Sequence, residues 1–213
     1  MKKLNVLLFN VVLAGAMLVV SSASTAGVKT NIGFASDYYF RGAFQAASSA
    51  SAGIDYEHES GLYAGTWWAD VDKGLETDFY GGYAGKVSEF DYDASLIVYD
   101  YTDGYDERYT EVNLKGGYKF ISLEYAIGKY DTVVKQDYTF LKIKGEYKDF
   151  YALFGSWGND LDGSYFELGY GTVVGGFDLD MAIIDNDKYL DSVTDKGNGE
   201  TTMIFSLGKK FDL

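Results

Sequence analysis

The sequence contains no cysteine and no proline, and its single histidine is His58. Without cysteine, disulfide bonds and thiolate metal sites are excluded, so stability must come from other interactions. Proline cannot donate a hydrogen bond to a β-ladder, and a chain built mostly of paired strands has few positions for it. One imidazole, expected beside a turn at a strand end, gives little support to acid–base catalysis. We therefore expect no enzyme, no metal site and no cofactor.

Positive charge is also scarce, because 18 Lys and Arg stand against 32 Asp and Glu, for a formal net charge of −14. Phosphate binding needs a basic surface, so a nucleic-acid partner is not expected. Aromatic residues and glycine are plentiful by contrast, with 20 Tyr, 14 Phe and 26 Gly. Aromatic side chains favour strands and glycine serves tight turns, so the composition favours an all-β fold.

The first 26 residues have the three parts of a secretory signal peptide. Two lysines precede an apolar run over residues 4–20, and small residues follow it. This run is slightly too short for a membrane-spanning helix. Cleavage after Ala23 or after Ala26 satisfies the small-residue rule at the cleavage site. We expect residues 1–26 to be a signal peptide and residues 27–213 to form one exported barrel domain.

Beyond the signal peptide, apolar and polar side chains alternate with a period of two residues, and no window of helical length shows a 3.6-residue period. Thr77 and Phe79, for example, fall on one face of a strand whose other face carries Glu76 and Asp78. Twelve strands are expected, at residues 28–38, 48–58, 62–71, 75–86, 88–99, 108–119, 122–130, 137–147, 150–158, 164–173, 177–184 and 200–211.

The connections between these strands alternate between tight turns and longer loops, the first of the longer loops covering residues 39–47. This pattern is typical of outer-membrane barrels with both chain ends in the periplasm. Closure is required there because lipid offers no hydrogen bonds to an open strand edge. We predict an all-β fold, a closed antiparallel up-and-down transmembrane β-barrel of about 12 strands. A soluble periplasmic β-sandwich has the same alternation and is the alternative.

Three segments carry a family resemblance: NIGFASDYYFRGAFQ (31–45), GIDYEHESGLYAGTWWADVD (53–72) and ETDFYGGYAG (76–85). They resemble the TorF-type porin family of conserved bacterial outer-membrane β-barrel proteins. The resemblance implies an outer-membrane barrel without a known substrate or catalytic residue. It also implies that Asp37 and Arg41 lie near the extracellular mouth. The alternating apolar residues of the C-terminal strand are similar to the terminal signal of bacterial barrels, so we expect the barrel-assembly machinery as a partner during insertion.

The charged faces of the strands are expected to enclose the lumen, where acids outnumber lysines and favour cations. Alternatively, these charges pair across the lumen and plug it. Asp37 and Arg41 either form an ion pair that holds the first extracellular loop over the mouth or are solvated. The candidate pore-lining or binding residues are Asp37, Arg41, Asp55, Asp70, Glu76, Asp78, Asp91, Asp93, Glu111, Lys115, Lys142 and Lys144.

Aromatic residues near the expected strand ends are predicted to form girdles at the two membrane interfaces. Tyr38 and Tyr39 instead have the chemistry to stack on a sugar or nucleobase cargo. The predicted girdle residues are Tyr63, Trp67, Trp68, Tyr83, Tyr99, Tyr101 and Tyr170.

The sequence therefore predicts a porin in the outer membrane of a Gram-negative bacterium, with passive passage of small hydrophilic solutes through an acidic, weakly cation-selective lumen. The alternative is a plugged structural or adhesive barrel that acts through its acidic extracellular loops. Lipid and lipopolysaccharide are the expected surroundings, and nothing marks a flat interface between copies, which favours a monomer.

Overall fold

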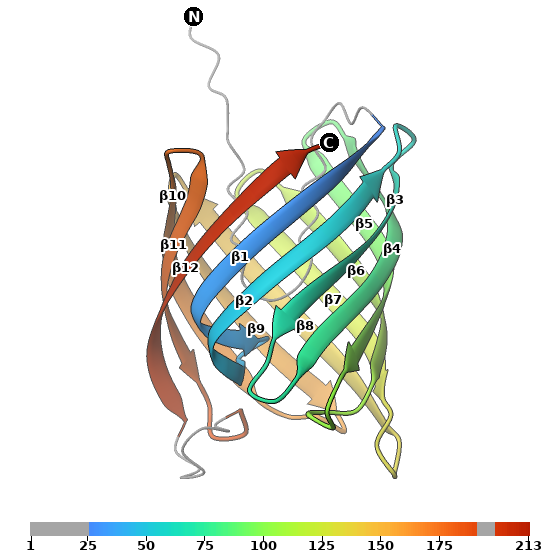
Figure 1. The fold of residues 1–213 in the computed structure, drawn as a ribbon, viewed down its shortest axis with the longest axis vertical. Helices are drawn as coiled ribbons and strands as arrows, with labels where there is room; N and C mark the ends of the chain where they lie inside the picture. The colour runs from blue at the N-terminus through green and yellow to red at the C-terminus, as the bar shows by residue number, and fades with distance from the viewer. Residues whose placement is uncertain (1–25, 191–198) are drawn as a thin grey trace, which may run out of the picture.

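Alternation of apolar and polar residues produces twelve antiparallel strands that form one closed barrel (Figure 1). The computed structural model describes residues 26–190 and 199–213, so most of the expected signal peptide lies outside it. In these two ranges no helix is long and apolar enough to cross a membrane. The strands are β1 (Gly27–Phe40), β2 (Ala43–Glu57), β3 (Leu62–Asp70), β4 (Leu75–Val87), β5 (Phe90–Tyr101), β6 (Tyr109–Tyr118), β7 (Ile121–Tyr130), β8 (Gln136–Tyr147), β9 (Phe150–Asn159), β10 (Ser164–Val174), β11 (Phe177–Asn186) and β12 (Glu200–Asp212).

Each strand pairs with its neighbours in sequence, and β1 pairs with β12 to close the ring. The predicted closed 12-stranded antiparallel barrel is confirmed, and the two-layer sandwich is wrong. The apolar faces do not pack against one another but form the outer surface. On β4, Phe79 is 52% exposed and Tyr83 is 45% exposed, whereas Glu76 and Asp78 on the other face are at most 1% exposed. The ionic faces therefore enclose the interior.

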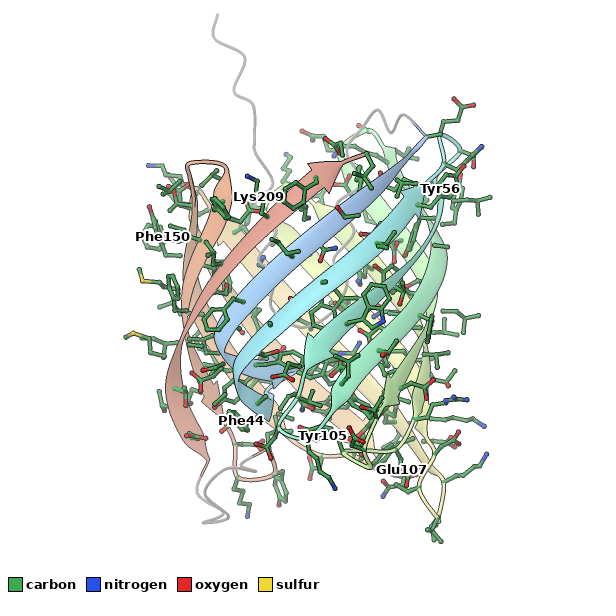
Figure 2. All side chains as sticks on the ribbon, viewed as in Figure 1. Phe44, Tyr56, Tyr105, Glu107, Phe150 and Lys209 are labelled. Atoms are coloured by element: carbon green, nitrogen blue, oxygen red, sulfur yellow. The ribbon has the colours of Figure 1, made fainter. Side chains whose placement is uncertain are left out.

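The two ends of the barrel differ, as the sequence predicts. One end, called the turn edge, carries the short connections and both termini of the barrel, and the other, called the loop edge, carries the longer connections (Figure 1). Tyr56 and Phe150 lie near the turn edge, and Tyr105 and Glu107 lie near the loop edge (Figure 2). The first connection at the loop edge departs from this pattern.

A two-residue turn, Arg41–Gly42, replaces the long loop that was predicted for residues 39–47. Both residues have positive φ, 49° and 87°, as the common tight β-hairpin turns require. Tyr38, Tyr39 and Phe40 form an apolar run without alternation, which concealed the continuation of β1. The strands β1 and β2 therefore continue to the turn as a hairpin.

This hairpin leaves the barrel wall. β1 pairs with β12 only as far as Ala35, and β2 pairs with β3 only from Ser51 onward. Tyr38 is opposite Ala46 but Tyr39 is opposite Phe44, so β2 has one extra residue at this point. Such a bulge bends a strand. Residues 36–50, called the inner hairpin from here on, bend into the barrel (Figure 1).

Candidate functional site

The tip of the inner hairpin lies across the lumen and contacts the far wall. The Phe40 ring packs against Tyr99 of β5 and Trp157 of β9, with ring centroids 5.1 and 6.0 Å apart. Trp157 Nε1 donates a hydrogen bond to the carbonyl oxygen of Arg41 at 3.0 Å. Asn186 Nδ2 of β11 donates to the carbonyl oxygen of Gly42, also at 3.0 Å. The hairpin thus obstructs the lumen in the half nearer the loop edge.

Arg41 is the centre of this contact. Its Nη1 and Nη2 donate to the two carboxylate oxygens of Glu111 on β6, at 2.8 and 2.7 Å, and Nη2 also donates to Glu124 on β7 at 3.1 Å. Its guanidinium carbon lies 4.3 Å from the centroid of the Phe140 ring. Arg41 follows neither of the two expectations, because the turn places it inside the barrel, where it is 6% exposed and pairs with Glu111 rather than with Asp37.

Glu111 is a hydrogen-bond hub that the wall itself provides. Besides Arg41, it accepts hydrogen bonds from the Tyr99 hydroxyl at 3.0 Å, the Tyr138 hydroxyl at 2.9 Å and Asn113 Nδ2 at 3.2 Å. Asn113 Nδ2 also lies 3.1 Å from an oxygen of Glu124. A buried carboxylate is tolerated only where donors and opposite charge compensate its lost hydration. The pairing of Arg41 with Glu111 meets both conditions.

Glu76 and Asp78 of β4 form a second buried acidic pair, beside the base of the inner hairpin. The Tyr38 hydroxyl donates to Glu76 Oε1 at 2.8 Å. Glu76 Oε2 and Asp78 Oδ1 have no hydrogen-bond partner within the part of the chain that the structure describes. Buried oxygens without partners are costly, so this pair is less well compensated than Glu111.

The remaining predicted lumen residues are distributed around the wall. Lys142 pairs with Glu124 at 2.7 Å and Lys144 with Glu146 at 2.9 Å, both from β8, while Lys115 lies on β6. On the acidic side, Asp55 of β2 and Asp93 of β5 are partly exposed. Three predicted residues lie apart from this lining: Asp91 pairs with Lys86 near the turn edge, Asp70 is exposed at the end of β3, and Asp37 is partly buried in the inner hairpin.

Four residues that we expected in the interface girdles lie on the inner side of the wall instead. Trp67 is 8% exposed and packs against Tyr38, and Tyr99 is 2% exposed. Tyr63 and Tyr101 share their inward orientation. Proximity to a strand end does not decide the face of a strand, and consecutive residues such as Trp67 and Trp68 point to opposite faces. Trp68, Tyr83 and Tyr170 have the outward parity that a girdle needs.

Several inward tyrosines form a motif that the sequence reasoning missed. The Tyr80 ring of β4 lies over Gly65, its pairing partner on β3, and its hydroxyl donates to Asp55 on β2. Tyr138 of β8 lies in the same way over Gly128 of β7 and donates to Glu111 of β6. We call each such set of tyrosine, glycine and acid on three successive strands a strap.

Two more tyrosines have the same relation to a glycine. Tyr63 of β3 lies over Gly82 of β4 and donates to Asp93 of β5 at 2.5 Å. Tyr151 of β9 lies over Gly169 of β10 and donates to Glu167 at 2.5 Å and to Asp180 of β11 at 3.3 Å. All four straps share an inward glycine opposite a tyrosine on the neighbouring strand.

Tyrosines also join the loops to the inner hairpin at the loop edge. The Tyr105 hydroxyl donates to the carbonyl oxygen of Gln45 at 2.8 Å. Burial, followed by the negative charges of Glu76 and Asp106, raises the pKa of Tyr105 to about 12, so its hydroxyl remains a donor at neutral pH. The Tyr38 and Tyr39 rings are at most 4% exposed and their hydroxyls donate to Glu76 and Thr202. Neither ring is open to a cargo in this arrangement.

Comparison with solved structures finds barrels of similar fold. One structure, described as "Unveiling the Mechanism Behind the in-meso Crystallization of Membrane Proteins", superposes with a TM-score of 0.61 over 88% of this chain and 84% of its own, at 8% identity. The KdgM porin superposes with a TM-score of 0.55 over 88% of this chain and 99% of its own, also at 8% identity. At such identities the likeness establishes the fold alone.

In residues 26–190 and 199–213, no group of three or more His, Asp or Glu is arranged to hold a metal ion.

Sequence comparison provides the family. No curated protein matches the chain. A family model described as "Bacterial protein of unknown function (Gcw_chp)" matches residues 20–182, and the chain belongs to this family.

Proposed function

We propose that this protein is a small porin of the outer membrane of Gram-negative bacteria that lets small hydrophilic solutes pass through an acidic lumen. The observation that carries the proposal is that the closed barrel has an apolar outer face and an ionic inner face. Apolar side chains such as Leu96, Ile127 and Leu168 are 51–57% exposed on the outside, while the ionic side chains face inward. Water does not favour such an outer surface, whereas acyl chains do.

Several further properties follow from this location. The segment before Gly27 acts as the signal for export, and the C-terminal strand is the one that the barrel-assembly machinery recognises. The loop edge, with acidic residues such as Asp103 and Glu107, faces lipopolysaccharide, and the turn edge faces the periplasm. A closed barrel satisfies its own backbone hydrogen bonds, so one copy suffices to span the membrane and we favour a monomer.

The lumen supports a cation preference. Asp55 and Asp93 are partly exposed on the acidic side of the wall, and the lysines of β8 are paired with Glu124 and Glu146. Partly exposed carboxylates attract cations, while lysines already paired with carboxylates attract anions weakly. The inner hairpin limits the passage, so we expect a small conductance.

Planar-bilayer recording of the purified protein tests the proposal. We expect small conductance steps with a reversal potential that favours cations. The double variant Asp55→Asn/Asp93→Asn should reduce that preference, whereas Asp149→Asn, in an exposed turn between β8 and β9, should not. Absence of steps from the natural protein, and also from a variant in which a short Gly-Ser turn replaces residues 38–46, would rule out a channel.

The second candidate function is a permanently plugged barrel that acts through its loops. The inner hairpin favours it, because Phe40, Arg41 and Gly42 all bind the far wall. In that case the hairpin replacement should lower stability without producing current, and deletions in the loop of residues 102–108 should remove the cellular phenotype. A change of ion selectivity on neutralising lumen acids contradicts this second function.

A further inference from the structure

We propose that Glu111, Glu124, Phe140 and Trp157 form a binding site for guanidinium-bearing organic cations, which the chain's own Arg41 fills. We call these four residues the cation pocket. The inference deepens the proposed function and rests on it for transport, because it names the class of solute that competes with the hairpin. The binding site itself is testable without any measurement of current.

The chemistry of the cation pocket matches a planar guanidinium closely. Glu111 receives both ends of the Arg41 fork at 2.7–2.8 Å, which is the bidentate geometry that distinguishes guanidinium from ammonium. Glu124 adds a second carboxylate at 3.1 Å. The ring centroids of Phe140 and Trp157 lie 4.3 and 5.5 Å from the guanidinium carbon, within the range of cation–π attraction.

One polar atom beside the pocket points to unused binding capacity. Asn113 Nδ2 donates to both carboxylates, but Asn113 Oδ1 has no partner among the described residues and Asn113 is 1% exposed. Arg41 provides hydrogen bonds from Nη1 and Nη2 to the carboxylates. Among the described residues, Asn113 Oδ1 is therefore an unpartnered acceptor beside the two carboxylates.

The wall builds the cation pocket without help from Arg41. Tyr99 and Tyr138 orient Glu111, and Lys142 holds the second oxygen of Glu124 at 2.7 Å. The backbone of the hairpin tip is anchored separately, by Trp157 and Asn186. The pocket should therefore keep its shape when the Arg41 side chain is removed, and it should then accept a free cation.

The same geometry makes the inner hairpin a tethered ligand. When the hairpin withdraws, Arg41 leaves, and two carboxylates face the lumen. A guanidinium-bearing solute that enters the lumen takes the vacated carboxylates and prevents the return of the hairpin. Tethering gives Arg41 a high effective concentration, so such solutes compete only when they are abundant.

Chemical rescue tests the pocket. Arg41→Ala is purified in detergent and melted with increasing methylguanidinium chloride at constant ionic strength, with sodium and tetramethylammonium chloride as comparison salts. We expect methylguanidinium alone to raise the unfolding temperature, with a logarithmic dependence on its concentration, by about 2–4 °C at roughly five times its dissociation constant. Adding Glu111→Gln to Arg41→Ala should abolish the rise. No rise, or an equal rise with all three salts, overturns the proposal.

The chain has two arginines, and each donates hydrogen bonds from two nitrogens to both oxygens of one carboxylate. The second arginine therefore provides a matched control. Arg108 binds the two oxygens of Asp100 at 2.7 and 2.9 Å on the exposed loop edge. Arg108→Ala should therefore show no such rise of the unfolding temperature with methylguanidinium. If Arg41→Ala folds poorly, the same salt added during refolding should restore the folded fraction, and a lack of recovery overturns the proposal.

Bilayer recording separates this inference from the proposed function. We expect Arg41→Ala to conduct more than the natural protein and methylguanidinium to block the added current. Rescue of stability without current in any variant supports the pocket and contradicts transport. Current that methylguanidinium neither blocks nor alters, together with no rescue, contradicts the pocket and leaves the porin intact.

Discussion

The substitution Glu111→Gln tests the most important contact in the lumen. It removes the carboxylate that receives the Arg41 fork, leaving the buried guanidinium with Glu124 at 3.1 Å. The Arg41 and Glu111 side chains are 6% and 0% exposed, so solvent cannot replace the lost partner. Breaking a buried ion pair by removing one charge costs about 3–5 kcal/mol. For a chain of this size each kcal/mol corresponds to about 2–4 °C, so we expect a decrease of about 6–20 °C.

Thermal unfolding of the detergent-solubilised protein, followed by far-UV circular dichroism and by heat-modifiable gel mobility, measures this decrease. Asp100→Asn is the control, since it removes the carboxylate of the other forked arginine on the exposed loop edge. Exposed pairs contribute little, so this variant should melt like the natural protein. Equal decreases in the two variants would refute the role of burial, and no decrease in Glu111→Gln would refute the anchoring of the hairpin by Arg41.

Two further substitutions test the wall. Leu96→Arg places a charge in the middle of β5 on the apolar outer face. It should destabilise the protein in lipid by about 2–4 kcal/mol, as measured by urea unfolding in vesicles. If Leu96→Arg is as stable as the control Leu96→Met, the proposed membrane location is contradicted. Gly128→Ala puts a methyl group against the Tyr138 ring and should cost about 1–3 kcal/mol, because the ring must move and its hydrogen bond to Glu111 weakens. Its control, Gly117→Ala, meets only an ordinary contact at 3.7 Å, and an equal loss in both variants would argue against the strap.

The alternation in the sequence predicts the strands well because one face of each strand of the wall is apolar and the other faces the interior. β3, predicted at 62–71, is observed at Leu62–Asp70, and β4, predicted at 75–86, is observed at Leu75–Val87. At the end of β1 in the inner hairpin, in contrast, residues on both faces are buried. Tyr38, Tyr39 and Phe40 are all at most 5% exposed, so no alternation marks this part of β1.

The sequence identifies several residues of the site but not which of them contact one another. The sequence selects Arg41 and Glu111, yet their pairing depends on the bend at Gln45, which is a single extra residue in β2. The girdle prediction is wrong for Tyr63, Trp67, Tyr99 and Tyr101. These residues lie near strand ends, but the two-residue alternation along the strand turns their side chains inward. The glycine opposite each strap tyrosine was visible in the sequence, but only the pairing register shows that the two are partners.

The straps have a consequence for how this barrel assembles. A ladder hydrogen bond forms as soon as two strands meet, whereas a strap needs three consecutive strands at the correct stagger, as Asp55, Gly65 and Tyr80 are. A strand that slips by one residue turns its tyrosine to the outside of the barrel and leaves the acid two strands away without its donor. Each strap thus stabilises only a triplet of strands in the correct register.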